Sequence, residues 1–418
     1  MSRRCSISSR TATPRTRTTL APSWPSPPMS VACFATTPPR ILCAVAPLRP
    51  SSKRARPRPS RSDSSGTVSR NDRTDLFAAA VAAQRAFDFE GAAGLFEQLL
   101  DARPFEAAHN LAVIRVQQGR TAQAEALFRR ALAQKPDAPW TRLALGSLYL
   151  QQGRYAEGWP LYEARRQVPG EAREPPHILP DLRAPEWRGE PIAGKRLLVL
   201  PEQGFGDVIM FSRFLAQLRS AGAEPVLAGL HKPLQPLFPD AVVLRRSQPP
   251  PEVDFWTVLG SLPFRLNATL ETVPPPGALG PSRRGGGGVG VMARGNPKFA
   301  YDFTRSLPAA AAERLLALGA DLHPDSTGAA DFRQTAEIIA GLDLVITVDT
   351  AVAHLAGSMG TPVWILLPAV NRDWRWLEAR EDSPWYPSAR LFRQAGLGAW
   401  DALVDRVVRE ASRVIRAP

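Results

Sequence analysis

Residues 344–357 read LVITVDTAVAHLAG, an apolar run that ends in Asp349-Thr350 and continues into small residues. This pattern predicts a buried strand over 344–348 followed at once by a helix over 352–359. Free N–H groups at the start of such a helix, with the Thr350 hydroxyl, suit a diphosphate. His354 follows one turn later and could donate to a phosphate or sugar oxygen. The alternative is a packed helix whose histidine belongs to the core.

Strand and helix patterns alternate on both sides of this stretch, from residue 195 to 367. Expected strands are 196–201, 225–230, 241–244, 253–258, 289–293, 344–348 and 363–367, and expected helices are 208–220, 309–318, 335–340 and 352–359. Proline- and glycine-rich linkers near 274–276 and 283–288 divide them into two α/β halves, 193–280 and 286–410. Two such halves imply a cleft between them, where ligands usually bind.

A second motif, EQGFGD at 202–207, follows an expected strand and opens an expected helix. Gly204 and Gly206 would let the backbone come close to a ligand. Asp207 lies at the helix start, where it is either a helix cap or a reactive carboxylate. The glycine spacing matches neither a dinucleotide fingerprint nor a Walker loop.

Residues 74–168 contain an internal repeat. The tetrapeptide QQGR occurs at 117–120 and again at 151–154, a period of 34, and the pairs at 95–96, 127–128 and 161–162 recur at a similar spacing. Each unit is typical of two short helices and resembles a tetratricopeptide repeat. We expect about three units, near 74–103, 106–135 and 139–168, with a connector over 169–192. They could present a docking surface or cap the following domain.

The formal charge of +13 in this chain of 418 residues is concentrated at its start. Residues 1–73 hold 14 of the 52 Lys and Arg but 2 of the 39 Asp and Glu, so the remainder is nearly neutral and favours no nucleic-acid partner. The leading segment is rich in Ser, Arg and Pro and is expected to be disordered. It is either a non-functional extension or a segment resembling an organelle transit peptide.

The three cysteines, Cys5, Cys33 and Cys43, all lie in that leading segment. The rest of the chain therefore has no disulfide, thiolate metal site or cysteine nucleophile, which fits a reducing, cytoplasmic location. No run of about 18 apolar residues occurs, so no membrane span is expected. The histidines are scattered and no Gly-x-Ser-x-Gly elbow occurs, which gives little support to a metal site or a serine hydrolase.

Two further stretches could contact a ligand. The loop over 296–306 carries Lys298 and Arg305, the cations nearest the expected cleft, although a solvated loop is an equal alternative. The stretches DWRW at 373–376 and SPWYP at 383–387 are dense in aromatic residues. Such residues can stack on a ring, but they more often pack a C-terminal segment onto the core.

Together, EQGFGD at 202–207, DLVITVDTAVAHLAG at 343–357, DWRWL at 373–377, SPWYP and RLFRQ at 390–394 resemble the heptosyltransferases of glycosyltransferase family 9, placed after tetratricopeptide repeats. The domain order is also distantly similar to protein O-GlcNAc transferases. The resemblance implies a GT-B fold of two Rossmann-like halves, with the nucleotide sugar held mainly by the second. It implies inverting sugar transfer without a catalytic metal or another cofactor.

Carried over by position, the resemblance makes Asp207 the general base that takes the proton of the acceptor hydroxyl. The expected donor-binding residues are Gly204, Gly206, Arg305, Asp349, Thr350, Ala351 and His354. Arg305 and the helix N–H groups would stabilise the charge of the leaving nucleoside diphosphate. We expect no metal site.

The leading hypothesis is a cytoplasmic glycosyltransferase of hexosyl- or heptosyltransferase type whose repeats recruit a protein or glycan acceptor. The alternative is a non-catalytic interaction scaffold with a degenerate transferase domain. The stretch 318–324 favours this alternative, because it is several residues shorter than the strand that approaches the nucleotide base in relatives. The sequence leaves the sugar, the base and the acceptor open.

Overall fold

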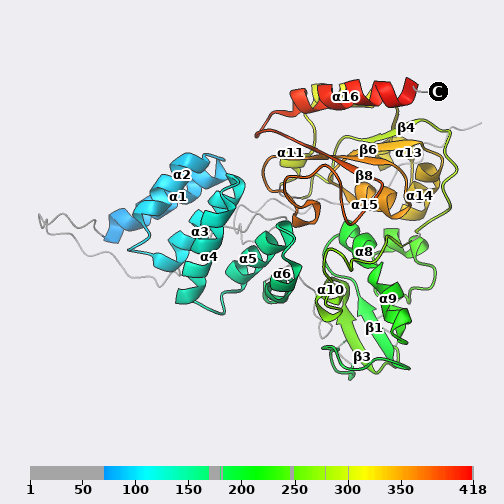
Figure 1. The fold of residues 1–418 in the computed structure, drawn as a ribbon, viewed down its shortest axis with the longest axis horizontal. Coiled ribbons are helices and arrows are strands. Elements are labelled where there is room, and N and C mark those ends of the chain that lie inside the picture. The colour runs from blue at the N-terminus through cyan, green and yellow to red at the C-terminus, as the bar shows by residue number, and fades with distance from the viewer. Residues whose placement is uncertain are drawn as a thin grey trace, which may run out of the picture. The chain divides into compact units, whose positions relative to one another are not determined.

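A computed structural model describes residues 70–168, 179, 182–244, 249–277, 279–299 and 301–416 (Figure 1). The leading segment expected over 1–73 lies outside the described residues except for its last four, which begin the first helix. Much of the connector expected over 169–192 lies outside them as well.

The N-terminal part consists of paired helices, as the repeat pattern predicted. They are α1 (Arg70–Arg85), α2 (Phe89–Gln98), α3 (Pro104–Gln117), α4 (Thr121–Gln134), α5 (Pro139–Gln151) and α6 (Tyr155–Tyr162), followed by the 3-10 turn η1 (Glu163–Gln167). Proline is the first residue of α3 and of α5, where its missing N–H costs nothing. The turns after α3 and α5 contain Gly119 and Gly153, both at positive φ. These shared signals explain why the pairs α3–α4 and α5–α6 have the same type of connection.

The first α/β half is a three-stranded sheet of order β2-β1-β3 with all strands parallel. Its elements are β1 (Arg196–Leu200), α8 (Phe205–Phe211), α9 (Phe214–Ser220), β2 (Glu224–Leu227), η2 (Lys232–Leu237), β3 (Phe255–Val258), η3 (Leu259–Ser261) and α10 (Leu262–Arg265). The single helix expected over 208–220 is two helices. The strand expected over 241–244 was wrong: this segment forms only an isolated bridge between Val242 and Ala228.

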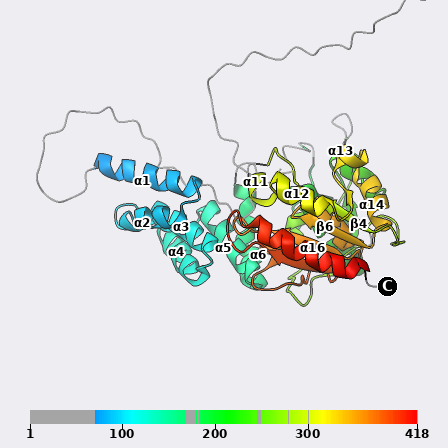
Figure 2. The ribbon, with the colours of Figure 1, turned by 90° about the horizontal axis from the view of Figure 1, so that it is seen from above.

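The second half is a five-stranded parallel sheet of order β5-β4-β6-β7-β8. Its elements are β4 (Val289–Met292), α11 (Asp302–Arg305), α12 (Ala309–Leu316), β5 (Ala320–Asp321), α13 (Pro324–Thr327), α14 (Phe332–Ala340), β6 (Leu344–Val348), α15 (Ala351–Ser358), β7 (Val363–Leu367), η4 (Trp374–Trp376), β8 (Ala389–Arg393) and α16 (Trp400–Arg416). Helices α12 and α16 lie side by side on one face (Figure 2), and α14 and α15 pack on the other. The expected architecture, helical repeats followed by two parallel α/β halves, is confirmed.

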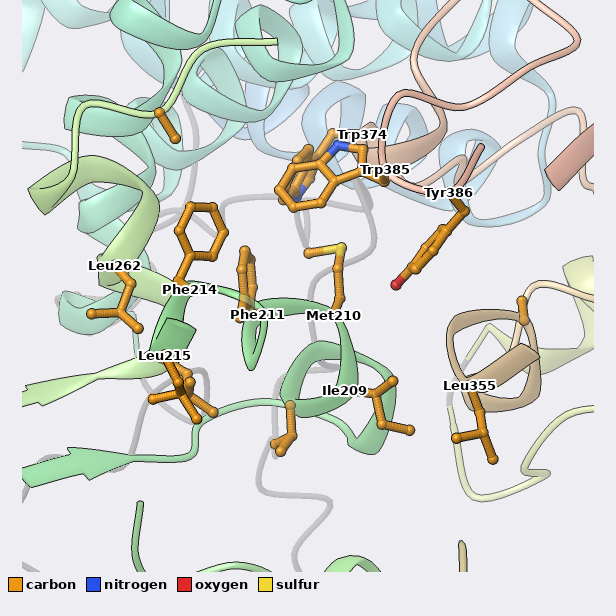
Figure 3. Close-up of a cluster of buried hydrophobic side chains, with 14 of the residues drawn as sticks. Ile209, Met210, Phe211, Phe214, Leu215, Leu262, Leu355, Trp374, Trp385 and Tyr386 are labelled. Carbon is orange, nitrogen blue, oxygen red and sulfur yellow. The ribbon is translucent and has the colours of Figure 1, made fainter. Parts of the chain in front are cut away.

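One apolar core joins the last helix pair to both halves. Trp159 of α6 packs edge-to-face against Trp374 at a centroid distance of 5.3 Å, and Trp374 packs against Trp385 at 5.9 Å. Figure 3 shows Trp374 and Trp385 next to Phe211 of α8. The aromatic stretches therefore pack onto the core, as one of the two interpretations predicted. Of the described helices, none is long and apolar enough to cross a membrane.

Candidate functional site

The strand β6 and the helix α15 meet at Asp349-Thr350, as the quoted stretch predicted. All five residues of β6 are buried, because β6 lies inside the sheet and is covered on both faces. Thr350 is the N-cap of α15: its hydroxyl accepts from the Val352 N–H at 3.3 Å and lies 3.2 Å from the Thr347 hydroxyl. Ala351 begins the helix and is partly exposed.

Asp349 lies at the carboxyl end of β6 and is buried. Burial, together with the nearby charge of Asp373, raises the pKa of Asp349 to about 6. Its backbone carbonyl accepts a hydrogen bond from Arg305 Nη1 at 2.7 Å. This carboxyl group therefore changes its charge closer to neutral pH than an ordinary aspartate does.

His354 lies one turn into α15 and is 6% exposed. Its ring stacks on Trp376 at a centroid distance of 5.3 Å, and its Nδ1 lies 2.9 Å from the Tyr386 hydroxyl. Burial lowers the pKa of His354 well below its usual value, and the positive charges of Arg375 and Arg213 act in the same direction. The imidazole is therefore neutral at pH 7.

The turn that precedes α8 carries the second motif. Gln203 has a φ of +61°, and its side-chain oxygen accepts from the Tyr162 hydroxyl at 3.3 Å. Gly204 is the N-cap of α8, and Asp207 at the third helical position accepts from the Gly204 N–H at 2.7 Å. Asp207 therefore caps α8, as one of its two interpretations predicted. One carboxylate can cap a helix and still accept a proton, because each of its oxygens has more than one lone pair.

Arg375 is the functional candidate that sequence reasoning missed. This buried guanidinium forms ion pairs with Asp207 of the first half and Asp373 of the second. Burial lowers the pKa of Arg375, but the two carboxylates outweigh it and the net shift is upward. The DWRW stretch was singled out for its tryptophans, and its arginine could have been found by asking which cation can accompany a buried acidic pair.

Helices α8 and α15 bring the two motifs together across the halves. A Cβ placed on Gly206 would lie 2.6 Å from His354 Cδ2 and 3.2 Å from His354 Nε2. Only a glycine allows this approach without displacement of the imidazole ring. Gly206, Asp207 and His354 therefore share one junction, although the first two precede His354 by about 150 residues.

Arg305 reaches the same region from α11, but it is held by neighbours. Its Nε donates to Asp302 at 2.9 Å, and its guanidinium lies 4.9 Å from the centre of the Phe299 ring. Together with the bond to the Asp349 carbonyl, these contacts place Arg305 beside the start of α15 with one carboxylate as a partner. Lys298, the other cation of this loop, is exposed. Within the described residues, no three His, Cys, Asp or Glu side chains are grouped to hold a metal ion.

Two family models match the chain. The tetratricopeptide repeat matches residues 115–158, which include α4 and α5. Glycosyltransferase family 9 (heptosyltransferase) matches residues 307–369, which include β6, α15 and the Asp349-Thr350 junction. The chain is glycosyltransferase-like. Both resemblances inferred from the sequence are confirmed, and Asp207, Arg305 and Arg375 lie outside the second match.

The chain is also similar to Protein FlbA of Caulobacter vibrioides, with 28% identity over 397 residues. The similarity covers 77% of this chain and 64% of that protein, so the chain spans slightly less than two thirds of the relative's length. Among solved structures, a mutant of the Thermobaculum terrenum O-GlcNAc transferase is similar, with 14% identity and a TM-score of 0.23. That similarity covers 84% of this chain and 95% of the other.

Proposed function

We propose that this protein transfers a sugar from a nucleotide-sugar donor to an acceptor hydroxyl, with inversion and without a catalytic metal. The observation that supports this most is the junction of α8 and α15. It places the turn at Gly206-Asp207 against His354, which belongs to the segment that matches glycosyltransferase family 9. One half would supply the base and the other would bind the donor.

The donor would bind at the start of α15. The N–H groups in the first turn of a helix have no partners within the helix, and they carry a partial positive charge. The Thr350 hydroxyl lies at the start of the helix, and Arg305 lies beside that start. The side chain of Ala351 is a single methyl group, which leaves room for a phosphate. These groups would stabilise the negative charge that the leaving nucleoside diphosphate gains.

Asp207 would accept the proton of the acceptor hydroxyl as its oxygen attacks the anomeric carbon and the bond to the diphosphate breaks. Gly204 N–H and Arg375 hold the carboxylate in one orientation. A fixed carboxylate loses less entropy when it meets the acceptor, which favours reaction. The helical repeats would recruit the acceptor, a protein or a glycan.

The test is release of nucleoside diphosphate from a panel of nucleotide sugars in the presence of a chelator. We expect the wild-type chain to release diphosphate with at least one donor. Asp207→Asn should lower the rate by about 100-fold or more, since general-base catalysis contributes factors of this size. The matched control is Asp101→Asn. The Asp101 carboxylate is fully exposed on the repeats, so this variant should have the wild-type rate. Equal rates for Asp207→Asn and wild type would remove Asp207 as the base.

A non-catalytic scaffold is the second candidate, and two observations favour it. Strand β5 is only two residues long, and Asp207 is already paired with Arg375. A scaffold of this kind should show no thermal shift with any nucleoside diphosphate, whereas the transferase should be stabilised by its product nucleotide. The same screen therefore separates the two functions before an acceptor is known.

A further inference from the structure

Tyr386, from the SPWYP stretch, contacts His354 and has been given no functional role above. Its hydroxyl lies 2.9 Å from His354 Nδ1, and its ring is buried. Gly357 of α15 makes room for it, since a Cβ there would lie 2.5 Å from the Tyr386 ring. Figure 3 shows the Tyr386 hydroxyl directed between Met210 of α8 and Leu355 of α15. This tyrosine is therefore built into the junction of the two halves.

Positive charge lies over the ring of Tyr386. The guanidinium of Arg213, from the junction of α8 and α9, lies 4.8 Å from the centre of the Tyr386 ring and donates to the Trp385 carbonyl at 2.7 Å. Burial raises the pKa of Tyr386 to about 12, and the charge of Arg213 opposes the rise. An arginine has only donors, so Arg213 cannot accept the proton of the phenol.

That proton has an acceptor in His354 Nδ1. A neutral imidazole carries one N–H, and the nitrogen that accepts a hydrogen bond is the one without the proton. The proton of the His354 ring therefore belongs on Nε2. Stacking on Trp376, with the two rings 21° apart, fixes the plane in which this N–H lies.

The Nε2 edge of His354 faces the first turn of α8, where a Cβ on Gly206 would lie 3.2 Å from Nε2. We propose that Tyr386 is a positioning residue that fixes His354 as the Nε2–H tautomer, so that this N–H can donate to a phosphate oxygen of the leaving nucleotide. The identity of the group that accepts from Nε2–H rests on the proposed function. The tautomer of His354 does not rest on it, because contacts within the protein alone determine which nitrogen carries the proton.

The first measurement is nitrogen-15 NMR of the full chain labelled at histidine, with His354 assigned by comparison with His354→Gln. Long-range proton–nitrogen correlations distinguish the two tautomers and the imidazolium directly. In wild type we expect Nε2 to be protonated and Nδ1 to accept a hydrogen bond. Protonation at Nδ1, or at both nitrogens at pH 7, would overturn the proposal without any ligand present.

Tyr386→Phe removes the hydroxyl and keeps the ring. We expect the His354 signals to shift and the Nδ1–H tautomer to become populated. The matched control is Tyr149→Phe, which removes a hydroxyl that donates to Glu125 on the repeats. That variant should leave the His354 signals unchanged. Unchanged His354 signals in Tyr386→Phe would contradict the positioning role.

Turnover tests the second half of the proposal. Tyr386→Phe should lower kcat by about tenfold, the effect of losing one well-oriented hydrogen bond, while KM for the acceptor stays the same. An unchanged kcat with an altered tautomer would show that His354 does not donate to the leaving group. If wild type turns over no nucleotide sugar, the proposed function fails, and the NMR result still decides the tautomer.

Discussion

At the scale of single residues, the main feature of the site is a set of buried charges, each of which is paired with a charge of opposite sign. Arg375 is the only cation of the described residues that forms ion pairs with both Asp207 and Asp373. Removing charged groups from water has a free-energy cost. The attraction between the paired charges offsets this cost, and it is lost when one partner is removed. Arg375 therefore stabilises this buried cluster and orients the carboxylate of Asp207, the proposed base.

Arg375→Gln should destabilise the protein by about 3 kcal/mol, because it leaves two neighbouring carboxylates without their counter-ion. Chemical denaturation followed by tryptophan fluorescence measures this loss. Arg314→Gln is the control, since Arg314 pairs with Asp401 and Asp405 at the exposed surface, where such pairs contribute about 1 kcal/mol or less. Equal losses for the two variants would contradict the assignment of Arg375 as a buried counter-ion.

His109 of α3 gives the repeats a predicted sensitivity to pH. This buried histidine lies 2.9 Å from the Thr141 hydroxyl through Nδ1, and burial lowers its pKa from 6.5 to about 3. Between these two values the unfolded chain binds a proton that the folded chain does not, so stability is lost as pH falls.

The free energy of unfolding should fall below pH 6.5 by about 1.4 kcal/mol for each pH unit from this group alone. Urea denaturation followed by circular dichroism at several pH values measures the slope. His109→Leu should remove this part of the slope. A variant with the wild-type slope would show that His109 is protonated in the folded state.

At the scale of elements, the helix pair α8 and α15 decides whether the two motifs meet. Gly206 is the residue that permits their closest approach. Each helix follows the carboxyl end of a central strand, β1 or β6, so both motifs arise at equivalent points of their sheets. The close contact between the halves therefore depends on the absence of a side chain at Gly206, where the junction of β1 and α8 meets α15.

Gly206→Ala should destabilise the protein by about 1–3 kcal/mol, the usual effect of extra volume in a packed region, because the new methyl group meets the His354 ring. Thermal denaturation gives the change. Gly94→Ala in α2 is the matched control: a Cβ there meets nothing within 4 Å, and alanine favours a helix by about 1 kcal/mol. Stabilisation by both substitutions would show that α8 and α15 are not in contact.

Elements with a strong local signal could be predicted, and elements fixed by distant contacts could not. Strand β6 has the β-favouring sequence LVITV, and the helical repeats are indicated by the recurrence of QQGR. Strand β5 is two residues long, and Ala320 and Asp321 both have low strand propensity, so only its pairing with β4 defines it. The segment expected as a strand over 241–244 has a single bridge to Ala228, just after β2, and its Val242 and Val243 are exposed, so buried contacts do not extend the pairing.

The same distinction applies to the site. Asp207 and the Asp349-Thr350 junction could be predicted because strand, turn and helix signals flank each of them. Arg375 could not, since its ion pair with Asp207 joins positions 168 residues apart. Nor could the contact of Gly206 with His354, which depends on how the two halves pack.

At the scale of the whole molecule, the last helix pair belongs to the α/β core as much as to the repeats. Trp159 donates to the Ala268 carbonyl at 2.9 Å, and Tyr155 accepts from Trp385 at 2.7 Å. Behind them, the buried Arg165 of η1 pairs with Glu202, the first residue of the EQGFGD motif. The repeats are thus connected to the turn that carries Asp207.

A chain that begins at residue 137 and keeps α5 and α6 should therefore unfold cooperatively, whereas a chain that begins at residue 169 should not fold. Circular dichroism and gel filtration of the two truncated chains distinguish these outcomes. A folded, monomeric chain from residue 169 would show that the last helix pair is a separate module.

In the proposed function, the start of α15 binds the diphosphate of a nucleotide through main-chain and hydroxyl donors. Calorimetric titration of nucleoside diphosphates into wild type and into Thr350→Val with His354→Ala, in a chelator, tests it most directly. At least one nucleotide should bind to wild type without a divalent cation, and the double variant should lose at least tenfold in affinity, which corresponds to about 1.4 kcal/mol. Equal affinity of the two proteins, or no binding of any nucleotide to wild type, would contradict it.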